Sequence, residues 1–200
     1  MNNEFLIDSK VDLSKMFDMQ EILNIKYNGK NWRHEVSSGK LKLAFLEECS
    51  EFTSELESDW KWYKNKDAKY NRQAALFELV DSIHFAMSLA LYRHPLDYIK
   101  LRLNWASGYS PTMYSPVTDK HNQYVKAITR FLTACDRDNL EDMIIGILNM
   151  CQVGGQMFEC SPGEIFQAYC IKNQRNHLRV EGGVMTGDYD KSKELELKLV

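Results

Sequence analysis

Residues 44–53 read AFLEECSEFT and residues 75–88 read ALFELVDSIHFAMS, and these two stretches decide the fold. In the first, apolar residues recur at helical spacing from Leu41 to Leu56. The second is apolar at most positions, and neither stretch alternates as a strand would. We therefore predict two long helices, over about 38–63 and 71–92.

Each predicted helix carries one pair of acidic residues within its apolar sequence. Glu48 and Glu51 form ExxE, and Glu78 and Asp81 form ExxD. The i, i+3 spacing places both members of a pair on one face. A single pair commonly lies on a solvated face, but two pairs on antiparallel apolar helices would direct four carboxylates into one gap. A divalent cation offsets that repulsion, and oxygen-only ligands favour Mg²⁺.

The remaining sequence predicts an all-α protein, a helical bundle with the four-carboxylate metal site between two antiparallel helices. Its length of 200 residues suits a single domain, 1–200. Pro162 and Glu164 follow a capping Ser161, and this pattern predicts a helix entry. We expect a break at Gly154-Gly155 and a loop over 108–119. The other helices are predicted over about 12–26, 120–135, 138–152 and 162–177.

Composition narrows the partners and the compartment. The net charge of −3 gives no electrostatic basis for binding nucleic acid or an anionic membrane. The sequence shows neither a signal-peptide core nor a stretch of about 20 apolar residues that would span a membrane. Five scattered cysteines suit reduced thiols. We expect a cytoplasmic protein without nucleic-acid or membrane partners.

Two cationic segments could bind phosphate. Trp60, Lys61 and Lys64 follow the first acidic pair, and they suit a polyphosphate and a stacked base, or simply an amphipathic helix end. Near the C-terminus a second set could share one helical face, which would bind phosphate oxygens or remain a polar solvent face. That set is Lys172, Asn173, Asn176 and Arg179.

FELVD after ECSE, followed much later by KNQRN, resembles the dimeric all-α dUTPases, part of the wider all-α NTP pyrophosphohydrolases. The resemblance covers about 12–95 and 162–191 and leaves about 96–160 as a variable helical part. It implies Mg²⁺-dependent hydrolysis of dUTP, and often dUDP, to dUMP, by a homodimer. A phage or bacterial member is expected.

The resemblance also implies roles for individual residues. Gln20 and Asn24 would hold the uracil and the deoxyribose, and one of Glu48 and Glu51 would act as general base. The other implied substrate-binding residues are Trp60, Lys61, Lys64, Lys172, Asn173, Asn176, Arg179 and Tyr189. The sequence departs from the family pattern at Val180 and Val184, where the family has polar residues.

The sequence leaves two alternative functions open. The first is a dCTP or broader dNTP pyrophosphohydrolase, because the amide of Gln20 could turn to suit either uracil or cytosine. The second is a non-catalytic helical interaction protein that uses the same acids as a charged face.

Overall fold

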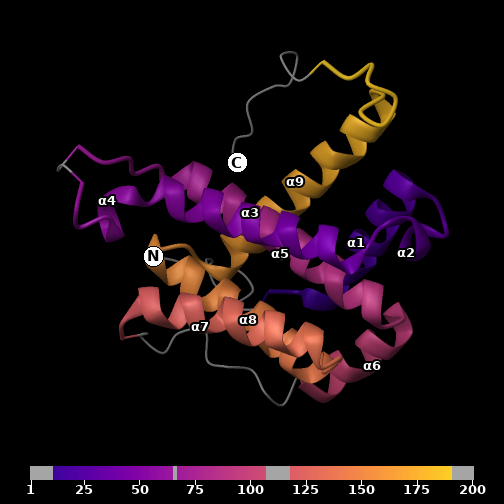
Figure 1. Cartoon of the computed structure of the whole chain (residues 1–200), viewed down its shortest axis with the longest axis horizontal. Helices are drawn as coiled ribbons and strands as arrows, with labels where there is room; N and C mark the ends of the chain where they lie inside the picture. The colour runs from indigo at the N-terminus through magenta and orange to yellow at the C-terminus, as the bar shows by residue number, and fades with distance from the viewer. Residues whose placement is uncertain (1–10, 65–66, 107–117, 191–200) are drawn as a thin grey trace, which may run out of the picture.

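A computed structural model describes residues 11–64, 67–106 and 118–190, and within these ranges it contains nine helices and no strand. The predicted all-α bundle is confirmed (Figure 1). In chain order the helices are α1 (Leu13–Asn28), α2 (Trp32–Glu35), α3 (Ser38–Glu55), α4 (Glu57–Trp60), α5 (Arg72–Arg93), α6 (Leu96–Ala106), α7 (Lys120–Asp136), α8 (Leu140–Met157) and α9 (Pro162–Glu181).

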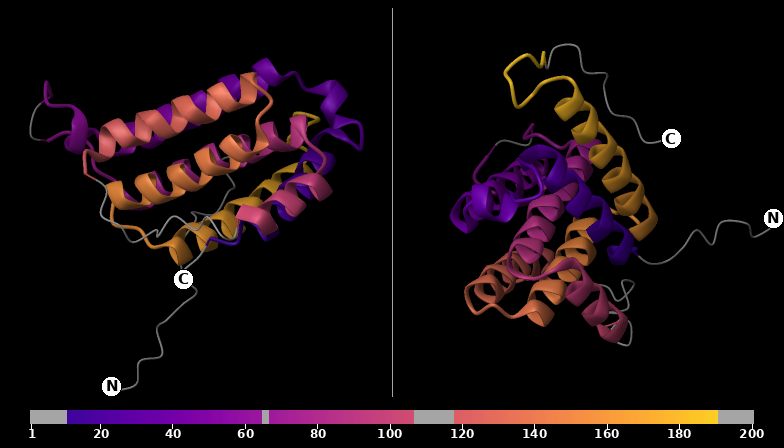
Figure 2. Two further views of the ribbon diagram at one scale, coloured as in Figure 1. Left: turned by 90° about the horizontal axis from the view of Figure 1, so that it is seen from below. Right: turned by 90° about the vertical axis from the view of Figure 1, so that its right-hand side faces the viewer.

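Helix α5 forms the centre of the bundle. It packs most extensively on α3 and also contacts α9, α8 and α1, while α7 packs against α8 (Figure 2). By length and hydropathy α5 could cross a membrane, but 78% of its apolar window is buried inside the protein. Its apolar sequence is therefore explained by its central position in the core.

Helices α3 and α5 are antiparallel, because the Asn71 N–H at the start of α5 donates to the Glu55 carbonyl at the end of α3, at 2.9 Å. The prediction that this helix continues to about residue 63 was wrong. The chain leaves the helix at Leu56, whose side chain is fully buried, and α4 follows as a separate short helix. The Trp60 indole fixes this turn by donating to the Thr53 carbonyl at 2.7 Å.

Helix α8 passes through the glycine pair at which we predicted a break. A Cβ on Gly154 would lie 2.7 Å from Leu79 Cδ1, and one on Gly155 would lie 3.1 Å from the Cys160 carbonyl oxygen. These glycines therefore allow α8 to pack closely, rather than ending it.

The helix starts were predicted better than the helix ends. Asp12 caps α1 by accepting from Lys15 N at 3.0 Å, and Ser161 with Glu164 forms the predicted capping box of α9. Helix α9 extends beyond the predicted end, to Glu181. The sequence reading did not identify α2 or α6. Most of the predicted loop over 108–119 lies outside the described residues.

Candidate functional site

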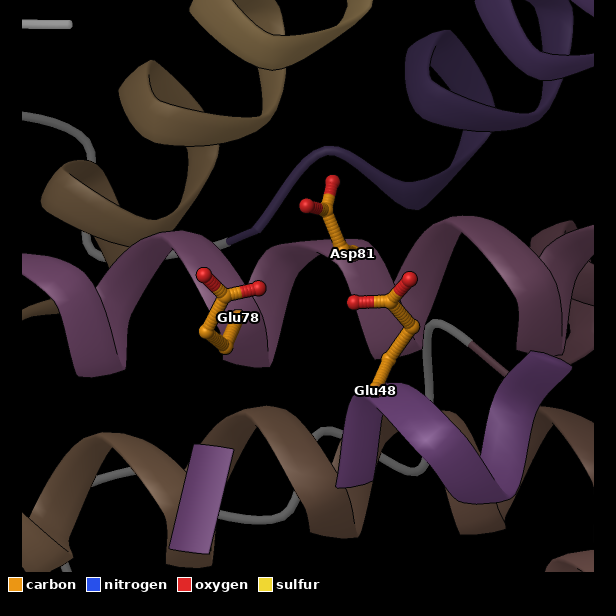
Figure 3. A group of neighbouring side chains, drawn as sticks. All are labelled: Glu48, Glu78 and Asp81. Carbon is orange, nitrogen blue, oxygen red and sulfur yellow. The ribbon is translucent and has the colours of Figure 1, made fainter. Parts of the chain in front are cut away.

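Three of the four predicted acids meet between α3 and α5. One carboxylate oxygen from each of Glu48, Glu78 and Asp81 lies within 4.8 Å of the other two. Glu48 reaches across from α3 toward the two acids of α5 (Figure 3). This spacing and the oxygen-only donor set allow the three side chains to hold a hard cation. Glu51 is exposed and does not belong to this group.

Burial and mutual repulsion disfavour negative charge in this cluster. Burial, followed by the carboxylates of Asp81 and Glu78, raises the pKa of Glu48 to about 8. Burial also raises the pKa of Glu78 and of Asp81, although the Lys172 ammonium opposes both effects. Lys172 is itself buried and forms an ion pair with Asp81. A bound divalent cation would lower the free energy of the ionised carboxylates much further than one lysine can.

A pocket of about 330 Å³ opens beside the carboxylates. Glu48 and Asp81 belong to its lining, so the cluster and the pocket form one site. Its size is within the range of small-molecule binding sites. The remaining lining residues are Gln20, Leu23, Asn24, Tyr27, Asn28, Trp32, Val36, Leu41, His84, Phe85, Ser88, Asn176 and Arg179.

The pocket contains three buried polar atoms that no described residue satisfies. Asn24 Nδ2, Trp32 Nε1 and His84 Nε2 are buried and have no hydrogen-bond partner among the described residues. Leaving a buried polar atom unpaired costs about 1–3 kcal/mol. All three residues line the same pocket, so a polar ligand there could satisfy all three atoms.

Three residues of the C-terminal set lie at the carboxylates or the pocket. Asn176 and Arg179 line the pocket, and Arg179 donates to the Asn176 side-chain oxygen at 3.2 Å. Lys172 reaches the acid cluster from the same helix. Asn173 is buried beside α1, where its amide lies 3.5 Å from the Met19 carbonyl oxygen.

The other predicted substrate residues lie away from the pocket. Lys61 and Lys64 both form ion pairs with Glu57, and the distance for Lys64 is 2.9 Å. Neither lysine lines the pocket, and neither do Trp60 and Tyr189. Their roles in substrate binding remain predictions.

Sequence reasoning missed several residues that line the pocket, among them a group on α5. His84 and Ser88 continue the polar side of α5 beyond Asp81, the apolar Phe85 follows His84 on the same helix, and Trp32 comes from the short helix α2. Successive spacings of three, three and four residues from Glu78 to Asp81, His84 and Ser88 form a polar stripe on an otherwise apolar helix. This polar stripe is the sequence feature from which His84 and Ser88 could have been predicted as site residues.

The described residues thus define a class: a helical bundle with a carboxylate cluster able to hold a metal ion, adjoining a small-molecule pocket. A family model described as dUTPase matches residues 12–183, and the chain belongs to this family. The family consists of dUTP diphosphatases, which are nucleoside triphosphate pyrophosphohydrolases, so the chain is an enzyme of this kind. This assignment displaces the alternative of a non-catalytic interaction protein. No curated protein matched the sequence.

Proposed function

We propose that this protein hydrolyses dUTP to dUMP and pyrophosphate in the presence of Mg²⁺. The observation that carries the proposal is the single site formed by the carboxylates and the pocket, since Glu48 and Asp81 line the space that also contains Gln20 and Asn24. If the deoxynucleoside part of dUTP occupied the pocket, the phosphates of dUTP would lie at the acid cluster. Family membership independently supports a dUTP diphosphatase.

The unpaired atoms of the pocket support a pyrimidine as the base. Asn24 Nδ2 and Trp32 Nε1 are donors. His84 Nδ1 lies 2.5 Å from Gln20 Oε1, so Nδ1 carries the proton of the neutral ring and Nε2 is an acceptor. Uracil presents two carbonyl oxygens on either side of one N–H. Two donors and one acceptor therefore suit uracil if His84 Nε2 faces the N–H. Cytosine also needs two donors and one acceptor, but with two of the three positions exchanged.

In this proposal the acidic residues bind the metal ion and the cationic residues bind the phosphates. Glu48, Glu78 and Asp81 would hold Mg²⁺. The exposed Glu51 would be either a further Mg²⁺ ligand or the general base. If Glu51 is a ligand, Glu48 would be the general base. Bound there, Mg²⁺ would offset phosphate charge and activate water for the hydrolysis. Lys172 and Arg179 would bind phosphate oxygens, with Asn176 holding the Arg179 guanidinium in place. Only the family resemblance supports a substrate-binding role for the remaining residues, which are Lys61, Lys64, Trp60, Asn173 and Tyr189.

We also propose that the enzyme is a cytoplasmic homodimer of single-domain subunits, without nucleic-acid or membrane partners. Support for association comes from apolar side chains left exposed on helices, such as Leu43 (70% exposed) and Leu46 (42%) on α3. One continuous hydrophobic core from α1 to α9 supports a single domain. Analytical ultracentrifugation at micromolar concentration should show a dimer, and a monomer would contradict this part of the proposal.

The test of the reaction is a substrate panel. kcat/KM for dUTP, dCTP, dTTP and UTP should be measured under one condition with Mg²⁺, with pyrophosphate release as the readout. We expect dUTP to be the best substrate, with dTTP excluded by its methyl group and UTP by its unpaired 2′-hydroxyl. A preference for dCTP or a purine nucleotide would contradict the choice of base but leave the reaction class standing.

A further inference from the structure

The carboxylate cluster contains one cationic side chain of the protein itself. Lys172 reaches from α9 to α5, where its ammonium forms an ion pair with the Asp81 carboxylate. Only 9% of the Lys172 side chain and 15% of the Asp81 side chain are exposed. A lysine is rarely buried this deeply unless its charge is paired, so the contact with Asp81 accounts for its position.

The ammonium of Lys172 acts on more than its direct partner. It opposes the rise in the pKa of Glu48, Glu78 and Asp81 that burial causes, so it lies close enough to offset the charge of all three acids. The Phe77 ring lies on another side of it, with Nζ 5.9 Å from the ring centroid. Lys172 is therefore a counter-ion for the whole cluster in the metal-free protein.

A divalent cation held by the same three acids would lie within a few ångströms of the Lys172 ammonium. The two cations would repel each other and would draw on the same negative charge, that of Asp81. The phosphates of a nucleotide would attract both of them. Asn176 and Arg179 line the pocket, and Lys172 shares their face of α9 at the spacing i, i+4 and i+7. Phosphates that extend from the pocket toward the acids would thus meet Lys172.

We propose that Lys172 is a shared counter-ion, which weakens Mg²⁺ binding while it pairs with Asp81 and binds phosphate when Mg²⁺ takes its place. The inference rests on the Mg²⁺ site of the proposed function. It adds a link between the two ligands, because cation and phosphate each favour the release of Lys172 from Asp81. A lysine that only supported the fold would not weaken the binding of one ligand and strengthen that of the other.

The test is Lys172→Met, which keeps the length of the side chain and removes its charge. The dissociation constant of Mg²⁺, measured by calorimetry without nucleotide, should fall about tenfold, the effect of removing a unit charge about 6 Å from a divalent ion in water. Removing the ammonium also favours protonation of the acids. The two proteins are therefore compared at the high-pH plateau of Mg²⁺ affinity, where protons no longer compete.

The second measurement is pyrophosphate binding in saturating Mg²⁺. Its dissociation constant should rise about tenfold in Lys172→Met, the effect of losing one hydrogen bond between charged groups. The matched control is Lys100→Met, which removes a lysine of α6 that pairs with Asp18 of α1 at 2.8 Å. Lys100 does not line the pocket, so this variant should change neither constant.

The outcomes separate the two proposals. Wild-type Mg²⁺ binding that is absent, or that Asp81→Asn leaves unchanged, overturns the proposed metal site and this inference together. Mg²⁺ binding that depends on Asp81 but is no tighter in Lys172→Met overturns this inference alone, and so does unchanged pyrophosphate binding.

Nitrogen NMR of the lysine ammonium groups gives a check that does not depend on the folding of Lys172→Met. The signal of Lys172 is the one that the charge-conserving variant Lys172→Arg removes. We expect Mg²⁺ to shift this signal in the wild type, because the ammonium leaves Asp81. A signal that does not respond to saturating Mg²⁺ would overturn the inference.

Discussion

Glu48→Gln should stabilise the metal-free protein at alkaline pH. The pKa of Glu48 is raised from 4.5 to about 8, mainly by burial and then by Asp81 and Glu78. The folded state therefore holds this proton more tightly than the unfolded state, and the stability it provides below about pH 4.5 is lost as pH rises toward about 8. Glutamine is neutral over this whole pH range, so Glu48→Gln does not lose this stability as pH rises.

The size of the effect follows from the two pKa values. A pKa rise from 4.5 to about 8 corresponds to about 5 kcal/mol at about 1.36 kcal/mol per pH unit. The Glu48 side chain is only half-buried, so solvent screening should reduce this to about 2 kcal/mol. Glu48→Gln should thus exceed the wild type by about 2 kcal/mol near pH 8.5 and match it near pH 5.

Urea unfolding of the metal-free proteins at these two pH values measures the difference. Comparing variant with wild type at each pH cancels the contributions of other groups, such as the buried His84. The matched control is Glu47→Gln, an exposed neighbour on the same helix, which should show no difference at either pH. Equal stability of wild type and Glu48→Gln near pH 8.5 would refute the argument that this carboxylate is destabilised by its site.

Mg²⁺ should reverse the order of stability, so that the wild type becomes more stable than Glu48→Gln. At one hundred times its dissociation constant, a ligand stabilises the folded state by about 2.7 kcal/mol. The wild type should gain this stability, and Glu48→Gln should gain much less because it lacks one carboxylate of the cluster. An equal gain in both proteins would place the cation elsewhere.

Three further predictions concern catalysis, the pocket and the core. Asp81→Asn should lower kcat more than about 100-fold with an unchanged circular dichroism spectrum, and near-normal turnover would contradict its role as a ligand. Arg33→Ala should raise KM about tenfold with little change in kcat, because Arg33 holds α2 by a bidentate pair with Glu21 at 2.9 and 3.0 Å; an unchanged KM would contradict this. Gly154→Ala should destabilise the protein by about 1–3 kcal/mol through its clash with Leu79, which a melting curve can detect; an unchanged Tm would show that α8 shifts freely.

The sequence was sufficient to predict the long helices and the acidic pairs, because both depend on local spacing. Glu48, Glu78 and Asp81 lie together because the apolar faces of α3 and α5 must pack, which turns the acids of the two helices into one gap. The break predicted at Gly154-Gly155 failed because glycine also serves close packing, which depends on a neighbour distant in sequence.

The pocket was harder to predict for the same physical reason. Its walls come from α1, α2, α3, α5 and α9, and local spacing cannot show which residues of separate helices share a cavity. The partners of Gln20 are an example. Its side chain contacts His84 and Ser88 of α5 and Tyr169 of α9, all of which lie far from it in the sequence.

The central claim is that the acid cluster and the adjoining pocket act together on the triphosphate of dUTP. Phosphorus NMR of dUTP incubated with the enzyme and Mg²⁺ tests this claim most directly, because the spectrum identifies which bond between phosphates is cleaved. We predict dUMP and pyrophosphate in equal amounts from the wild type, and no products from Glu78→Gln. The appearance of dUDP and inorganic phosphate, or equal turnover by both proteins, would contradict the account.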